Sequence, residues 1–189
     1  MNRISTIAMA AALGLTVATS AKAWTGYGND TLGPEVFLTY NGTSISVSVA
    51  SPDQGPYDGV EDTYIGVINN SSKTLNSINL NGGTQSIFGF DGDGIDTYGS
   101  PGNAMDTTGY GGPQGYFTGI VGNTGTINFI GGVPAGGTTY FSLEEPIASA
   151  IGSGSGGGLT GGVPDAGSTM ALLGSALVGL GALRRRFNA

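Results

Sequence analysis

The chain has 189 residues, of which 37 are glycine and 8 are proline, a composition that disfavours long helices and favours short strands and turns. It contains no cysteine and no histidine, which excludes disulfide bonds, zinc sites with Cys or His ligands, and Ser-His-Asp or Cys-His catalysis. Between Trp24 and Thr160 twelve acidic residues accompany one basic residue, Lys73, and this net charge of about −11 argues against a nucleic-acid partner.

The N-terminus has the pattern of a secretory signal peptide. Arg3 supplies a short positive region, residues 4–18 are apolar, and Ala21 and Ala23 fit the A-x-A rule for cleavage. We therefore expect residues 1–23 to form a signal helix that signal peptidase removes after Ala23. An uncleaved anchoring helix is the alternative, which the shortness of the apolar region disfavours.

Residues 24–148 show the pattern of a mainly β body in which short strands alternate with turns. Ile45, Val47 and Val49 alternate with serines, which is the period-2 pattern of a half-buried strand. The dipeptide Asn41-Gly42 predicts a type I′ hairpin turn before that strand. The expected strands cover residues 35–40, 43–50, 63–68, 75–80, 87–90, 116–121, 126–130 and 138–143. Strands of this length and spacing predict an antiparallel β-sandwich or a jelly-roll-like domain.

The densest acidic motif lies at the start of a glycine-rich stretch, residues 91–115, which is long for a loop without strands. Asp91, Asp93 and Asp96 occupy positions 1, 3 and 6 of Asp-Gly-Asp-Gly-Ile-Asp, where glycines permit a tight curl around one Ca²⁺. The spacing is not that of an EF-hand, because position 12 is Gly102 instead of Glu. We expect a solvated Asp-Gly turn here and no cofactor, with a calcium site formed by Asp91, Asp93 and Asp96 as the alternative.

Two further features keep other functions of the body open. Asp58, Glu61 and Asp62 form a second acidic group, and Asp58 or Glu61 paired with Asp93 would suit a small polysaccharide-acting enzyme. Loop carboxylates are usually solvated, and a body of about 125 residues offers little wall for a cleft, so we expect no enzyme. Rings beside turns can also stack on sugars, as in a carbohydrate-binding module. Four tyrosines fit that description: Tyr57, Tyr98, Tyr110 and Tyr116.

The C-terminal part of the chain begins with a Gly/Ser-rich linker, residues 149–162. Half of these residues are glycine, so we expect a flexible tether with an end-to-end distance of roughly 20 Å. Residues 166–183 then carry no charge, and Arg184, Arg185 and Arg186 follow directly. Eighteen helical residues reach about 27 Å, close to the thickness of the bilayer core. We therefore expect a transmembrane helix with its C-terminus in the cytoplasm, with a buried helix of the body as the alternative.

The segment 163–189 as a whole resembles the PEP-CTERM class of bacterial sorting signals, in its VPDSG-type variant. That variant runs Val-Pro-Asp-Ser-Gly-Ser-Thr, and the chain departs from it only at Ala166. The matching residues are Val163, Pro164, Asp165, Gly167, Ser168 and Thr169. The resemblance implies an exported protein that is held transiently in the inner membrane and cut by an exosortase, a multipass membrane enzyme. It also implies a final place at the cell surface or in a biofilm matrix, with exopolysaccharide as a candidate partner.

Overall fold

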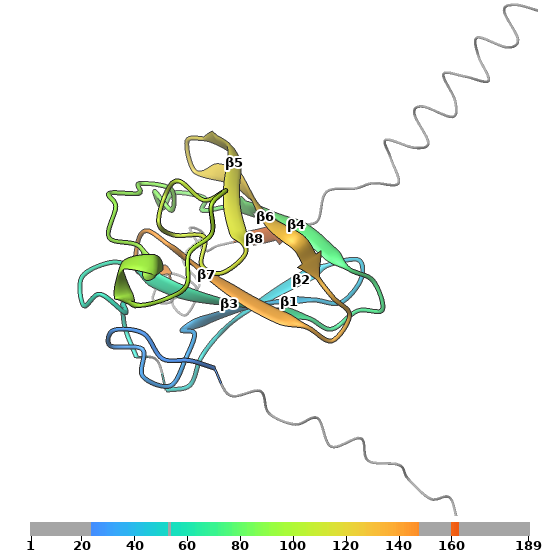
Figure 1. Cartoon of the computed structure of the whole chain (residues 1–189), viewed down its shortest axis with the longest axis horizontal. Helices are drawn as coiled ribbons and strands as arrows, with labels where there is room; N and C mark the ends of the chain where they lie inside the picture. The colour runs from blue at the N-terminus through green and yellow to red at the C-terminus, as the bar shows by residue number, and fades with distance from the viewer. Residues whose placement is uncertain (1–23, 53, 148–159, 163–189) are drawn as a thin grey trace, which may run out of the picture.

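The computed structural model describes residues 24–52, 54–147 and 160–162. These residues form eight strands in two sheets that enclose one core (Figure 1). The prediction of a mainly β body is therefore confirmed. The predicted signal helix, most of the linker and the predicted membrane span lie outside the described residues, and within the described residues no helix is long and apolar enough to cross a membrane.

The two sheets have four strands each. The first has the order β2-β1-β3-β7 and the second the order β5-β6-β4-β8. The strands are β1 (Val36–Tyr40), β2 (Ile45–Val49), β3 (Thr63–Asn69), β4 (Leu75–Asn81), β5 (Gly115–Val121), β6 (Thr124–Val133), β7 (Thr138–Leu143) and β8 (Thr160–Gly162). Seven of the predicted strands are present, with bounds that differ by a few residues at most.

The predicted strand at 87–90 is wrong. This segment forms turns, in which Gly89 donates its backbone N–H to the carbonyl oxygen of Ser86 at 2.9 Å. Its apolar side chains still pack into the core, although the segment pairs with no strand of the described residues. Ile87 is fully buried, and Phe88 packs edge-on against Phe117. A short apolar run therefore predicted burial correctly but the wrong backbone conformation.

The core between the sheets consists of the inward-facing side chains of alternate strand positions. Leu38, Ile65 and Phe141 from the first sheet meet Ile78 and Ile127 from the second, and all of them are fully buried. Each such side chain contributes about 1.5–3 kcal/mol through its removal from water. The half-buried apolar residues of β2 pack against the same core, as the period-2 pattern predicts.

One neighbouring pair of strands, β1 and β3, is parallel, so the prediction of a purely antiparallel sandwich is wrong at this point. The register places Val36 opposite Ile65 and Tyr40 opposite Asn69. The antiparallel strand β2 returns the chain to the end where β1 starts, since Val49 lies opposite Val36, and β3 starts at that same end along the other edge of β1.

The β1–β2 hairpin turns one residue later than predicted. Asn41 donates its backbone N–H to the carbonyl oxygen of Ser44 at 3.0 Å, so the central residues are Gly42 and Thr43. Gly42 has a φ of 96°. Thr43 does not have a positive φ, because Glu145 is the only residue other than glycine with a positive φ in the described part of the chain. A glycine with positive φ at the first central position is typical of a type II′ turn, not of type I′.

A second, smaller cluster covers the outer face of β3 and β7. Tyr27, Tyr57, Tyr64 and Ile95 are buried there, and Tyr140 packs against them. The glycine-rich stretch 91–115 crosses this face and contains the 3-10 helix η1 (Ile95–Tyr98). The stretch thus has a defined path, and together with the other long loops it gathers at one end of the two sheets, on the left of Figure 1.

The carboxylate of Asp106 organises the middle of this glycine-rich stretch. Its oxygens accept hydrogen bonds from the backbone N–H groups of Thr108, Gly109 and Gly111 at 2.8–3.1 Å. Asn103 adds two bonds from its side-chain amide to the carbonyl oxygens of Gly112 and Gly115. The backbone groups of a loop with few apolar residues are satisfied in this way by two polar side chains.

The strand β8 was not predicted. It pairs antiparallel with β4, with Asn79 opposite Gly162, Leu80 opposite Gly161 and Asn81 opposite Thr160, and it also lies close to β2 of the other sheet. These residues were predicted to belong to the flexible linker 149–162, because half of that segment is glycine. The open edge of β4 supplies the reason for the pairing, since an edge strand presents backbone groups that need partners.

Candidate functional site

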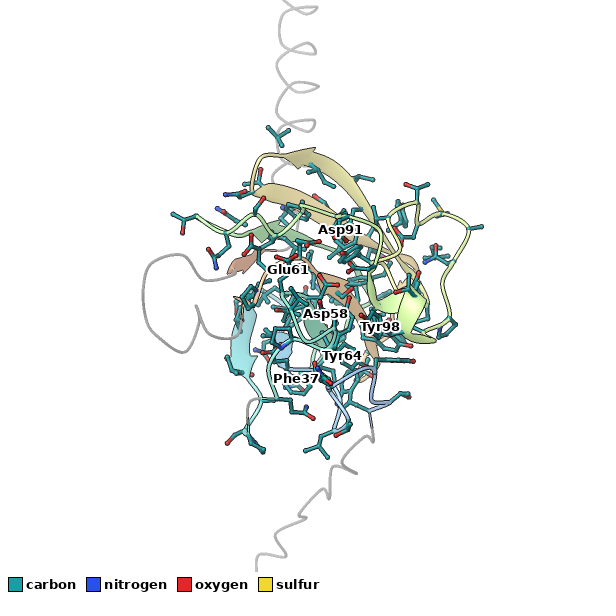
Figure 2. All side chains as sticks on the ribbon, turned by 90° about the vertical axis from the view of Figure 1, so that its left-hand side faces the viewer. Phe37, Asp58, Glu61, Tyr64, Asp91 and Tyr98 are labelled. Carbon is teal, nitrogen blue, oxygen red and sulfur yellow. The ribbon has the colours of Figure 1, made fainter. Side chains whose placement is uncertain are left out.

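Acidic side chains meet at the end of the first sheet where β3 begins and β7 ends. Glu61 lies two residues before β3, and Glu144 follows β7 directly. Because Thr63 pairs with Leu143 in the antiparallel β3–β7 ladder, these two carboxylates are brought to the same place. Figure 2 shows Glu61 and Asp91 on the loop-bearing side of the molecule.

We call the resulting group the carboxylate cluster. It consists of Glu61, Asp62, Asp91, Asp93 and Glu144. Carboxylate oxygens of Glu61, Asp91 and Glu144 all lie within 4.8 Å of one another. Asp62 and Asp93 join them through a shared neighbour, the hydroxyl of Tyr110, which lies 3.4 Å from Asp62 Oδ1 and 2.8 Å from Asp93 Oδ1.

The hydroxyl of Tyr110 lies at the centre of the cluster. It is also 3.2 Å from Asp91 Oδ1 and 2.8 Å from Glu144 Oε2, and the Tyr110 side chain is fully buried. Burial raises the pKa of Tyr110, so the hydroxyl keeps its proton. One hydroxyl donates only one hydrogen bond at a time. The buried carboxyl groups of Asp62 and Glu144 therefore compete for this one proton, whereas Asp91 and Asp93 are exposed to water.

The deepest member of the cluster is Asp62, which is fully buried. The Tyr57 hydroxyl donates a hydrogen bond to Asp62 Oδ2 at 2.6 Å and lies 3.2 Å from Ser142 Oγ. Burial raises the pKa of Asp62 to about 8, while the hydrogen bond from Tyr57 acts in the opposite direction. Burial likewise raises the pKa of Glu144, which is only 6% exposed.

Of the three predicted calcium ligands, the structure brings Asp91 and Asp93 together but places Asp96 elsewhere. Hydrogen bonding between the first two carboxyl groups lowers the pKa of Asp91 and raises that of Asp93. The helix η1 begins at Ile95 and turns Asp96 toward Gly102, away from the other two. Burial, followed by the charge of Asp106, raises the pKa of Asp96 to about 6.

No basic side chain of the described ranges balances the carboxylate cluster. Lys73 is the only basic residue in these ranges, and it lies in the turn between β3 and β4. The cluster lies at the start of β3, and Lys73 lies beyond its end, which at about 3.3 Å per residue is roughly 20 Å away. A charge at that distance is screened at physiological ionic strength.

Asp58 and Glu61, which belong to the second acidic group of the sequence, have different roles. Asp58 Oδ1 accepts backbone N–H groups from Val60, Glu61 and Asp62 at 3.0–3.1 Å, so this carboxylate builds the loop that presents Glu61. Glu61 itself belongs to the carboxylate cluster. Glu144 was not predicted as a site residue, because its meeting with Glu61 depends on the β3–β7 pairing.

The four tyrosines considered for sugar stacking differ in how far they are exposed. Tyr57 and Tyr110 are 1% and 0% exposed, so the prediction that they offer a ring face to a sugar is wrong. Tyr98 is 38% exposed and packs edge-on against Tyr57 with ring centroids 5.1 Å apart, and Tyr116 is half-buried. A carbohydrate-binding role of these rings therefore rests on Tyr98 and Tyr116.

Comparison with protein families gives a match at the C-terminus, a VPDSG-CTERM motif over residues 162–187. The chain carries an exosortase-type sorting signal. The match confirms the resemblance deduced from Val163 to Thr169 and includes the three arginines. The VPDSG-CTERM signal indicates export to the cell surface and processing by an exosortase-type system. No curated protein and no solved structure matches the chain.

Proposed function

We propose that this protein is held in the inner membrane by its C-terminal span, with the C-terminus in the cytoplasm, and is then released to the cell surface or the exopolysaccharide matrix. The VPDSG-CTERM match at residues 162–187 carries the proposal. Ala21 and Ala23 support export through a cleaved signal peptide. The run Arg184–Arg186 supports the orientation, because positive charges flank a span on its cytoplasmic side.

Mass spectrometry of protein from the surface fraction tests this proposal. We expect a mature chain that begins at Trp24 and lacks the arginine cluster. Replacing Pro164 and Asp165 together by alanine should leave the longer form in the membrane fraction. The matched control is Ala166→Ser, which restores the serine of the family motif and should mature at least as well as the wild type. An intact C-terminal end on most surface-located protein would contradict the proposal.

The carboxylate cluster supports a second proposal, that the body binds one Ca²⁺ through Glu61, Asp91 and Glu144, with Asp93 as a neighbouring donor. Oxygens that bind one Ca²⁺ at 2.3–2.6 Å lie at most about 5 Å apart. The oxygens of the three proposed ligands lie within 4.8 Å of one another. A divalent cation would also balance carboxylates that no nearby basic side chain neutralises, and calcium prefers such all-oxygen sites.

Thermal unfolding of the mature protein with and without calcium tests the second proposal. A ligand at 100 times its Kd stabilises the folded state by about 2.7 kcal/mol, which for a body of this size raises Tm by roughly 10 °C. Asp91→Asn should abolish that shift, whereas Asp96→Asn, the matched control outside the cluster, should retain it. Loss of the shift in Asp96→Asn as well as in Asp91→Asn would favour the ligand set Asp91, Asp93 and Asp96 considered from the sequence, and no shift in the wild type would refute calcium binding.

A further inference from the structure

The strand β8 connects the sorting signal to the folded body. Its three residues, Thr160–Gly162, pair with β4, and the VPDSG-CTERM match begins at Gly162. The first residue of the sorting signal is therefore part of a β-sheet, opposite Asn79. Figure 1 shows β8 beside β4 at the edge of the second sheet.

The edge of β4 is suited to binding an extended segment. The other side of β4 is paired with β6, and the inward side chains Ile78 and Leu80 are buried in the core, so the strand is held in place. Gly161 and Gly162 bring no side chains to the pairing. Recognition of this kind depends on backbone hydrogen bonds, as in other cases of strand addition to a sheet edge.

We propose that the β4 edge is the docking site of the segment just before the sorting signal, and that this docking competes with processing of the signal. The proposal rests on the proposed function, because it concerns the same processing event. An enzyme that binds the signal as an extended chain needs the backbone groups of Gly162. Those groups cannot pair with Asn79 and with an enzyme at the same time.

Docking also determines how far the body can stand from the membrane. With β8 in place, three residues separate the sheet from the predicted span at residue 166, a reach of about 10 Å. With β8 released, the 18 residues from 148 to 165 set the limit instead, and the maximum reach grows to about 60 Å. A docked body therefore lies against the membrane surface, where it obstructs an enzyme embedded in the same membrane.

A disulfide lock between the two strands tests the competition directly. The protein contains no cysteine, so Asn81→Cys combined with Thr160→Cys creates one defined pair of thiols. These positions are directly opposite in the ladder, and antiparallel partners lie within the Cα separation that a disulfide allows. We expect the oxidised full-length chain to mature at least tenfold more slowly than Thr160→Cys alone, and a reductant to restore the rate.

Two proline variants provide the opposite perturbation. Gly82 donates its backbone N–H to Asn123 in the β4–β6 register, so alternate residues of β4, Asn79 and Asn81, direct their backbone groups toward β8. Thr160 lies opposite Asn81, so Thr160→Pro removes a ladder donor and Gly161→Pro does not. Loss of one backbone hydrogen bond raises the released fraction about fivefold. Thr160→Pro should therefore mature about fivefold faster, while Gly161→Pro is its matched control and should mature at the wild-type rate.

The outcomes separate this inference from the proposed function. Equal maturation of the locked and single-cysteine chains would overturn the competition, and failure of the disulfide to form in the folded protein would overturn the docking. A wild-type chain that never loses its C-terminus would instead overturn the proposed sorting. In that case disulfide formation between positions 81 and 160 still decides whether β4 is the docking site.

Discussion

Replacing Tyr110 by phenylalanine removes one hydroxyl from the centre of the carboxylate cluster and leaves the ring in place. The hydroxyl lies within 3.4 Å of oxygens from four carboxylates, and it is 2.8 Å from Glu144 Oε2. A hydrogen bond to a charged group contributes about 1.5–3 kcal/mol. Water does not replace this donor easily, because Glu144 is only 6% exposed. We therefore expect Tyr110→Phe to lower the free energy of unfolding by about 2–3 kcal/mol in calcium-free buffer at pH 7.

Urea unfolding of Tyr110→Phe beside Tyr40→Phe measures this effect against a neutral reference. The Tyr40 hydroxyl donates to the carbonyl oxygen of Gly42 at 2.6 Å, an uncharged acceptor, so its loss should cost about 1 kcal/mol. Burial raises the pKa of Glu144, and a protonated carboxyl group donates its own hydrogen. The cost of Tyr110→Phe should therefore shrink as the pH falls toward 4, while that of Tyr40→Phe should not. Equal costs at pH 7, or a Tyr110→Phe cost that does not change with pH, would refute the reasoning.

Three further variants probe the loops and the sheet. The pKa of Asp96 is raised by burial from its ordinary value of 3.8 to about 6, so the wild type loses stability as the pH rises through that range. In calcium-free buffer, Asp96→Asn should therefore gain stability over the wild type from pH 4 to pH 7 in urea titrations. Asp58→Ala removes the acceptor of three backbone N–H groups and should cost about 1–2 kcal/mol in the same assay, whereas Asp58→Asn keeps the oxygen and should cost less. Gly66→Ala places a Cβ 2.8 Å from Pro34 Cγ and 2.9 Å from Phe37 Cδ1, and this overpacking should lower Tm by an amount equivalent to about 1–3 kcal/mol.

Local patterns predicted most of the strands because the strands obey local rules. The alternation of Ile45, Val47 and Val49 with serines is visible within a few residues, and it places the same side chains against the core. The parallel pairing of β1 and β3 was not predictable in this way, since it depends on which edge of β1 receives β3. The strand β8 was not predicted for a related reason, because its partner edge belongs to residues 79–81, far away in the sequence.

The candidate site shows the same division between local and distant information. Asp91 and Asp93 are two residues apart, so their proximity followed from the sequence alone. Glu61 and Glu144 reach the same place only through the β3–β7 ladder, and no spacing rule connects them. Tyr110 was considered for sugar stacking because it lies beside a glycine-rich turn, yet the loop folds back and buries the ring among the carboxylates. The acidic loop could therefore be identified from the sequence, but the residues that contact it could be identified only from the fold.

The pairing of β8 with β4 has a consequence for the modularity of the protein. A C-terminal sorting signal can be regarded as a segment that is transferable to other proteins. Here, however, the boundary between the folded body and the sorting signal falls within a β-sheet. A body truncated after Ile147 would expose the edge of β4, and exposed edges recruit strands from other molecules. Such a truncated body should self-associate, whereas one that ends at Gly162 should remain monomeric. A transplantable version of this signal would therefore have to start upstream of Thr160, and the body left behind would need a replacement strand.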